Sequence, residues 1–581
     1  MTEGCRFSLS NLARVREKPF PAPDMFRPLS STLKHRLSAL PLLVCVLLFL
    51  FHFSVIRKYA VNIPYMDEWA LFSGDNHPAS IDLRWLYVQH NEHRTATTKI
   101  FVWLQYQING WNVRTHLLID FVIYGFLLTW LVWFARRMAP HLSTWIVFAF
   151  LIFFLSPIIW IEHLVAYPVA VHFWLIFFFV SAYFLFTERQ QWASLVVGCL
   201  ASILSMYSFA AGFVTSLVLL LAFWIFKGLR ARHATGNKDR TREFRQLLLV
   251  TVLVGGALVG WIIGYRTPWY HPPLIFPYHL AFWRFFLNLI SFSFGVDRLS
   301  VFWGVIFLLI VLAPICGEVW KRRGNLSSMQ WAAFAIVFAI LADLAAISIG
   351  RASFGTFWSR SPEYAEHGMP LIILSAINWS IFFRDRKILR ACSIAALWIF
   401  CLVAFTDNWD FDIYRYHSGL RLEGARCVRA YYQGIGDGGC PSILPGPSNP
   451  QLPLFDQAKR LNASFSRDST KANRSSGQTV YLGAHDAADC HHIMGWAYDK
   501  SDPDAIVVVS IYDGDSLLRT IPAIGFRPDL VNAGIGTGAY SFEYETPPAL
   551  KDGRPHSIRV QFAGTTLALP NSPKVLTCSK P

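Results

Sequence analysis

Charged residues are scarce in this chain, since Asp, Glu, Lys and Arg make up only 15% of its 581 residues. A water-soluble globular protein carries about 25%. The low charge content, 54% hydrophobic residues and a mean hydropathy of +0.37 together exclude a large soluble enzyme. An aromatic content of 16% also excludes a disordered or fibrous chain. Most of the chain is therefore expected to be solvated by lipid.

Several motifs are also absent from the sequence. The ten cysteines form no Cys-x-x-Cys pair and no Cys/His spacing of a zinc site. No internal repeat of the kind common in transporters is recognisable. The C-terminal part has neither a nucleophile elbow nor the Ser, His and Asp order of a hydrolase. These absences exclude a zinc finger and a hydrolase triad in that part.

Long apolar runs are the dominant feature. A helix needs about 20 residues to cross a hydrocarbon layer of about 30 Å. Runs of this kind predict eleven membrane-spanning helices, near 39–56, 115–135, 142–157, 167–186, 192–206, 212–226, 247–265, 299–318, 329–349, 368–383 and 388–405. The apolar stretch 281–296 has Arg284 and Asn288 in its middle, so we interpret it as an interfacial or re-entrant helix. The fold class expected for 39–406 is an α-helical multi-pass membrane bundle.

The basic residues predict the orientation of this bundle. With the N-terminus inside, the inner segments hold more than twice as many Lys and Arg as the opposite short loops, which satisfies the positive-inside rule. The net charge of +15 is therefore a topology signal and not evidence for nucleic-acid binding. We expect a membrane protein in contact with membrane lipids, with a basic cytosolic tail (1–38) and a C-terminal region on the opposite, outer face.

The C-terminal region changes character twice. Residues 407–477 are rich in Gly, Pro, Asn and Ser and are predicted to be a linker. From 478 to 581, short β-branched runs such as 506–512 end at Asp-Gly turns, which predicts an all-β sandwich domain. Four cysteines lie in this C-terminal region, and proximity favours the disulfides Cys427–Cys440 and Cys490–Cys578 over the two other pairings.

Chemically capable residues gather in the outer loops. The long first outer loop, 57–114, contains the adjacent carboxylates Asp67 and Glu68, which are either functional or an ordinary acidic turn. Further along, His90 and Arg94 are four residues apart, with His93 between them. On a helix His90 and Arg94 share one face, and an imidazole beside a guanidinium suits the binding of a phosphate group. An ordinary amphipathic surface helix is the alternative.

Later outer loops add further candidates. Glu162 lies in the short loop 158–166, and Arg351 and Arg360 lie in the loop 350–367. The two arginines suit a phosphate ester, although arginines at helix ends also extend to the membrane interface without a ligand.

Two carboxylates lie within predicted spans, Asp120 and Asp343. Intramembrane carboxylates are functional or paired by default. The sequence leaves both alternatives open. If the two carboxylates are paired, the expected ion pairs are Asp120 with Arg114 and Asp343 with Arg351.

The C-terminal domain offers two further candidate sites. Trp496, Tyr498 and Tyr540 suit stacking on sugar rings, or else belong to the core. A cluster of Asp499, Asp502 and Asp504 suits calcium, or else is a solvated turn.

Taken together, one span, a long first outer loop with an acidic pair, a second outer acidic position (Glu162) and an Arg-containing late loop resemble the type C glycosyltransferases (the GT-C superfamily). The resemblance covers about 39–406. It implies a bacterial inner (cytoplasmic) membrane protein with a periplasmic C-terminal region. It also implies transfer of a sugar from a polyprenyl-phosphate donor to a cell-envelope glycan or lipid acceptor on the periplasmic face, with inversion.

The resemblance also implies roles for individual residues. Asp67 would be the general base, Glu68 or Glu162 would orient the acceptor, and Asp67 with Glu68 would hold Mg²⁺ or Mn²⁺ if an ion is used. The residues expected at the donor phosphate are His90, His93, Arg94, Arg351 and Arg360. Those expected at the acceptor or glycan are Trp69, Tyr364, Trp496 and Tyr498. The alternative functions are a transporter or flippase of a lipid-linked glycan, and a polysaccharide ligase or acyltransferase.

Overall fold

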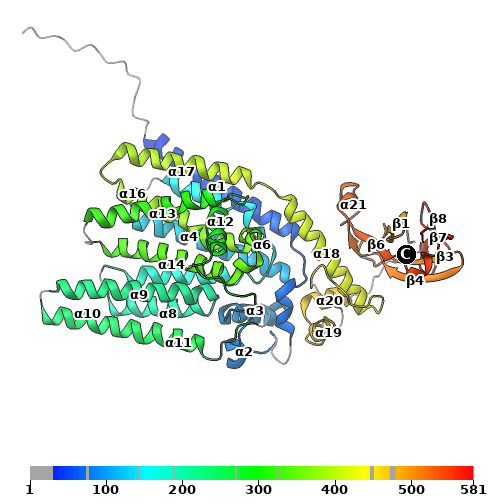
Figure 1. Cartoon of the computed structure of the whole chain (residues 1–581), viewed down its shortest axis with the longest axis horizontal. Coiled ribbons are helices and arrows are strands. Elements are labelled where there is room, and N and C mark those ends of the chain that lie inside the picture. Colours follow the sequence, from blue (N-terminus) through cyan, green and yellow to red (C-terminus); the bar gives the residue numbers. More distant parts are fainter. Residues whose placement is uncertain are drawn as a thin grey trace, which may run out of the picture.

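The computed structural model describes residues 31–73, 78–140, 144–188, 190–234, 236–268, 271–322, 326–444, 451–470 and 479–579. Most of the expected basic tail, residues 1–30, lies outside the described residues. The chain is mostly helical, and its strands all belong to the C-terminal region (Figure 1).

Seven helical segments of the described residues are long and apolar enough to cross a membrane. They are formed by α1 (Ser31–Tyr59), α4 (Val113–Met138), α9 (Ala210–His233), the continuous run of α10 (Asn237–Val250), η3 (Thr251–Gly255) and α11 (Gly256–Ile262), α13 (Val301–Arg322), α14 (Ser328–Arg351) with η4 (Ala352–Phe354), and α17 (Lys387–Asp407). Large apolar side chains such as Phe126 and Phe302 are exposed on their outer faces, as expected for contact with lipid. The multi-pass prediction is confirmed at this level.

The count of eleven spans is not confirmed. Four of the predicted spans form shorter helices, namely α5 (Thr144–Phe154) with η2 (Pro157–Ile159) and α6 (Trp160–Leu164), then α7 (Val169–Leu185), α8 (Trp192–Met206) and α16 (Pro370–Phe382). Helix α7 has 17 residues, α8 has 15 and α16 has 13. Pro157 follows α5, where its missing N–H ends the regular hydrogen-bond ladder.

The stretch expected to be interfacial or re-entrant forms α12 (Leu280–Ser293), which packs against α13 and α14. Gly304 of α13 permits the close approach, because a Cβ atom there would lie 2.0 Å from the carbonyl oxygen of Leu287. From Phe285 to Ser293, α12 is buried inside the bundle.

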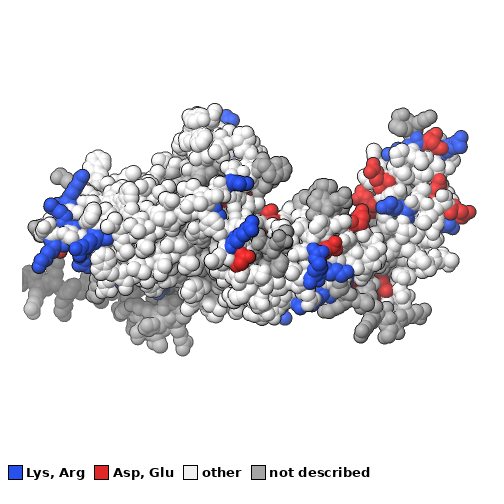
Figure 2. Space-filling model, turned by 90° about the horizontal axis from the view of Figure 1, so that it is seen from below, with Lys and Arg blue, Asp and Glu red and all other residues white. Residues whose placement is uncertain are grey.

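The two ends of the bundle differ in charge. Lys and Arg side chains gather at the end opposite to the strands (Figure 2). This end includes the last turn of α9, with Arg230 and Arg232, and the basic α10. The other end holds the connecting segments η1 (Met66–Phe72), α2 (Leu83–Tyr87), α3 (Ala96–Asn109), η5 (Thr356–Arg360) and α15 (Pro362–Gly368).

The segment expected to be a linker contains three helices, α18 (Asp412–Tyr432), α19 (Leu452–Arg460) and α20 (Ser464–Thr470). They pack on the end of the bundle that holds the connecting segments. The N–H of Met66 donates to the carbonyl of Ile443 at 2.8 Å, and the N–H of Ser464 donates to that of Gly110 at 2.8 Å. A disulfide joins Cys427 of α18 to Cys440.

The C-terminal region forms two antiparallel sheets, with strand orders β1-β2-β6-β5 and β4-β3-β7-β8. The strands are β1 (Tyr481–Ala488), β2 (His492–Asp499), β3 (Val508–Asp513), β4 (Ser516–Pro522), β5 (Gly525–Phe526), β6 (Ala539–Glu545), β7 (Pro555–Phe562) and β8 (Lys574–Thr577), with α21 (Pro528–Asn532) and η6 (Pro548–Leu550) between them. The apolar residues that alternate along β3 and β7 meet in one core. The all-β prediction is thus confirmed.

The β region is attached to the bundle through α18. The Arg426 guanidinium donates to the carbonyl of Ala505 at 2.6 Å and lies over the ring of Tyr540. Glu423 accepts the N–H of Phe526 at 2.7 Å. A second disulfide, Cys490–Cys578, closes the β region, so the structure contains both bridges that proximity in the sequence favours.

The Cys427–Cys440 disulfide closes a short loop with a sequence separation of 13. A loop of this size constrains the unfolded chain by about 3 kcal/mol. We expect Cys427→Ser with Cys440→Ser to lower the denaturant midpoint of the purified protein accordingly. Cys316→Ser, which removes an exposed free thiol, is the control. An unchanged midpoint in the double variant would show that the bridge does not stabilise α18.

Candidate functional site

A tight turn between α2 and α3 forms the centre of the candidate site. The N–H of His90 donates to the carbonyl of His93 at 2.8 Å, and the N–H of His93 donates back to the carbonyl of His90 at 2.8 Å. Asn91, with a φ of 48°, adopts the left-handed conformation that such a turn requires. The prediction of a helix that places His90 and Arg94 on one face is therefore wrong, because 88–95 is not helical.

Arg94 holds this turn against the bundle. Its guanidinium donates to the carbonyls of Trp261 at 2.9 Å, of Ile263 at 2.8 Å and of Tyr87, and it stacks on the Tyr87 ring at 4.0 Å. Only 2% of Arg94 is exposed. Since its donors are directed at backbone carbonyls in the interior, Arg94 has a structural place and not the phosphate-binding one expected from the sequence.

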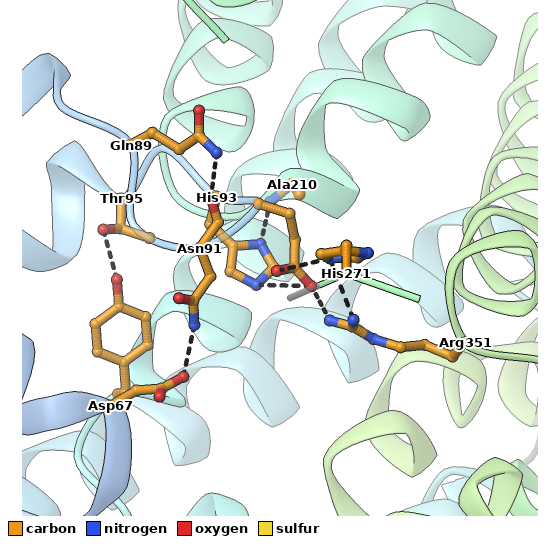
Figure 3. A network of polar contacts seen from close by, with 10 residues as sticks. Asp67, Gln89, Asn91, His93, Thr95, Ala210, His271 and Arg351 are labelled. Atoms are coloured by element: carbon orange, nitrogen blue, oxygen red, sulfur yellow. Dashed lines mark hydrogen bonds and ion pairs between the residues drawn. The ribbon is translucent and has the colours of Figure 1, made fainter. Parts of the chain in front are cut away.

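Glu92, on the same turn, contacts a histidine and an arginine from distant segments, His271 and Arg351, which Figure 3 labels. Arg351 at the end of α14 forms an ion pair with Glu92, although 259 residues separate them. The Nε2 of His271 lies 3.5 Å from the Glu92 carboxylate. The Arg351 guanidinium lies 3.2 Å from the same His271 nitrogen. Tyr364 of α15 lies close enough to Arg351 to interact with it electrostatically. Burial alone would raise the pKa of Glu92, but His93, Arg351 and His271 hold it below its ordinary value.

Asp67 lies on the other side of the same turn. Its Oδ2 accepts a hydrogen bond from the Asn91 amide at 2.6 Å, and its side chain is exposed. Tyr167, from the loop before α7, packs on His90 at 4.4 Å between ring centroids and bonds to Thr95 at 2.8 Å. Figure 3 shows the Asp67 carboxylate bonded to the Asn91 amide on one side of the turn, with His271 and Arg351 on the other side. The turn thus connects an accessible carboxylate to a guanidinium.

Glu68 has a different environment from its neighbour. Its carboxylate accepts the backbone N–H of Tyr65 at 2.8 Å and that of Ala166, and only 1% of the residue is exposed. Burial raises its pKa to about 7, opposed by those N–H groups and by Arg421. Glu68 therefore fastens η1 to the loop before α7. Because Asp67 and Glu68 have separate partners, this structure does not present them as a chelating pair.

Glu162 lies deeper in the bundle, and its neighbours are His172 and Glu366. His172 is itself bonded to Asp120 at 2.7 Å, and Asp343 is bonded to His367 at 2.6 Å. The intramembrane carboxylates are therefore paired with histidines of neighbouring helices. The ion pairs considered from the sequence, with Arg114 and Arg351, do not form.

Two more candidates lie outside the turn. Arg360 pairs with Asp297 and has no recorded contact with the Glu92–Arg351 cluster among the described residues. Trp69 is fully buried between Phe455 and Phe465, so it has no free face for an acceptor.

The aromatic residues of the β region are largely packed. Tyr498 is 8% exposed and lies 4.5 Å from the ring of Tyr540, which is fully buried. Trp496 is half-buried against the same cluster. Asp499 accepts hydrogen bonds from the N–H and hydroxyl of Ser501, which makes it part of a turn.

Several residues at the site were not singled out from the sequence. Asn91 and Glu92 sit beside the histidines that were chosen, yet they make the contacts to Asp67 and Arg351. His271 comes from a segment with no recognised motif. His172 could have been identified from the sequence, because an ionisable side chain within a predicted membrane span is by default a candidate for a functional site.

Comparison of the chain with protein-family models, with curated proteins and with solved structures gave no match. The functional argument accordingly depends on the residues and contacts described above.

The surroundings of His93 predict an acid-sensitive fold. Its Nδ1 accepts the N–H of Ala210 at 3.3 Å, and its ring stacks on Phe209 at 4.0 Å. Burial lowers the pKa of His93 to about 4, against about 6.5 in an unfolded chain. Between these values the unfolded state binds the extra proton, so stability is complete above pH 6.5 and is lost as the pH falls toward 4.

We expect His93→Gln to remove part of that loss, which amounts to at most about 3 kcal/mol for this shift. The measurement is the unfolding temperature in detergent between pH 4 and 7. His491→Gln, at an exposed histidine of the β region, is the control. Identical pH profiles for His93→Gln and the unaltered protein would show that His93 does not cause the loss of stability at low pH.

Proposed function

We propose that this protein is an integral-membrane glycosyltransferase that moves a sugar from a polyprenyl-phosphate donor to a hydroxyl of an envelope glycan or lipid. One observation supports the proposal above the others. The turn at 90–93 joins the accessible carboxylate of Asp67 to the guanidinium of Arg351, at the end of the bundle that carries the β region. This is the pairing of a base with a phosphate-binding cation that the reaction requires.

In the proposed reaction Asp67 accepts the proton of the acceptor hydroxyl while that oxygen bonds to the anomeric carbon. The bond from this carbon to the phosphate oxygen breaks on the opposite face, which inverts the configuration. The leaving polyprenyl phosphate gains negative charge. Arg351 and His271 stabilise that charge, since a guanidinium donates in paired geometry to phosphate oxygens.

Glu92 has a separate role in this proposal. It holds Arg351 at the site before the donor binds. A donor phosphate would compete with the Glu92 carboxylate for the same N–H donors. Because the Arg351 side chain is 19% and the Glu92 side chain 20% exposed, the pair is accessible to such an exchange.

The proposed orientation places the site on the periplasmic face of a bacterial inner membrane. The basic end of the bundle would face the cytosol, in agreement with the positive-inside rule. The two disulfides support an oxidising compartment for the opposite end.

The test is a transfer assay in membranes supplied with radiolabelled polyprenyl-phosphate sugars. We expect Asp67→Asn to lower the transfer rate by about 10²–10⁴-fold, because it removes the base. Arg351→Ala should lower it by about 10²–10³-fold through loss of charge stabilisation. Asp515→Asn and Arg554→Ala change the same residue types at exposed positions of the β region and should leave the rate unchanged. Full transfer by Asp67→Asn would exclude the proposed base.

A transporter or flippase of a lipid-linked glycan is the second candidate. It is favoured by the buried carboxylate–histidine pairs Asp120–His172 and Asp343–His367, since chains of such groups serve as proton relays in transporters. The same membranes separate the two functions. A transporter would move the labelled lipid-linked sugar across the bilayer without forming a new glycosidic bond.

A further inference from the structure

We propose that Glu162, His172 and Glu366 bind a first-row divalent metal ion, of the zinc type, inside the helical bundle. One ligand atom from each residue lies within 4.8 Å of the others. Glu162 comes from α6, His172 from α7 and Glu366 from α15. Each of the three residues is at most 1% exposed. The site is distinct from Asp67, and its assignment does not depend on the proposed sugar transfer.

The orientation of His172 supports this assignment. Its Nδ1 donates to Asp120 Oδ1 at 2.7 Å, which leaves Nε2 directed at Glu366. Metal-binding histidines usually donate their other ring N–H to a carboxylate, which fixes the tautomer and strengthens the ligand. Asp120 is thus a positioning residue, and Nε2 presents its lone pair to the site.

The hydrogen bonding of the cluster is incomplete without an ion. Both oxygens of Glu366, Oε2 of Glu162 and Nε2 of His172 are buried and lack a hydrogen-bond partner. The distance between His172 Nε2 and Glu366 Oε2 is 3.5 Å. This is longer than an ordinary N–H to oxygen hydrogen bond of about 2.7–3.2 Å. It is close to the separation of about 3.4 Å between ligands of a tetrahedral zinc with bonds of about 2.1 Å.

Charge balance points in the same direction. Three carboxylates, from Asp120, Glu162 and Glu366, surround a single imidazole in the interior of the bundle. Each unbalanced charge buried in a low-dielectric interior costs several kcal/mol. A divalent cation offsets this charge directly.

The ligand types select the class of metal. Imidazole favours zinc and other first-row transition metals over magnesium and calcium, and carboxylates complete such a site. Three protein ligands leave one position of a tetrahedral ion for water or another oxygen. Since all three residues are enclosed, the bound ion would exchange slowly with chelators.

The metal would join three segments of the bundle. Helix α15 carries Glu366 into the cluster and Tyr364 toward Arg351. An ion bound at Glu366 would therefore fix α15 between the interior and the turn. We infer a structural role, in which α6, α7 and α15 are held together.

The first test is the metal content of the full-length protein purified from medium supplemented with zinc and manganese. We expect about one zinc or manganese per chain in the unaltered protein and less than about 0.1 in Glu366→Gln and His172→Asn. Glu543→Gln, at an exposed carboxylate of the β region, is the matched control and should keep the metal. Unaltered protein that holds no more metal than Glu366→Gln overturns the proposal, and so does protein that holds only magnesium or calcium.

A second measurement covers the case in which those two variants fail to fold. X-ray absorption of the metal in the unaltered protein should show nitrogen and oxygen ligands only, at about 2.0–2.2 Å. Asp120→Asn keeps the side-chain size but weakens the acceptor for His172, and it should lower metal affinity by about 10–100-fold. A sulfur ligand in the spectrum, or an unaltered affinity in Asp120→Asn, would contradict the assigned ligands. Sugar transfer is not a readout here, so the two proposals fail independently.

Discussion

The ion pair between Glu92 and Arg351 is the contact on which the candidate site depends. It joins the first loop of the chain to the end of α14, and it positions Asn91 to bond Asp67. Loss of one partner of a largely buried pair leaves the other charge uncompensated, at a cost of about 3–5 kcal/mol. The pair is therefore strong enough to keep the turn in place, while its partial exposure leaves Arg351 accessible.

The same constraint, that a buried charge needs partners, determines the rest of this end of the bundle. Arg94 is satisfied by backbone carbonyls, and Lys99 donates to the carbonyls of Trp85 at 2.7 Å and Val88 at 2.6 Å. These carbonyls belong to the C-terminal ends of α2 and α11, where they have no partner within the helix. Arg94, which was expected from the sequence to bind phosphate, and Lys99 therefore hold non-helical segments together.

Hydropathy was sufficient to predict the long helices and the β region, because lipid-facing helices and sandwich strands each impose a period on the sequence. Its count of eleven spans is not confirmed, since α8 and α16 are apolar but short. Spacing failed at His90 and Arg94, where Asn91 reverses the chain. The sequence could indicate which end of the bundle carries Asp67 and Arg351. It could not identify Glu92 and His271 as the partners of Arg351, because those contacts form only when the helices pack.

The position of α15 relates the two polar centres of the bundle. Tyr364 and Glu366 are two residues apart, and successive residues of an α-helix are about 100° apart. Their side chains therefore leave the helix on nearly opposite sides, one toward Arg351 and the other toward His172. Helix α15 has only seven residues, and so short a helix has little stability of its own. Its orientation therefore comes from its neighbours, which include α12, α14 and α6, and Glu366 and Tyr364 link it to the two polar centres from opposite sides.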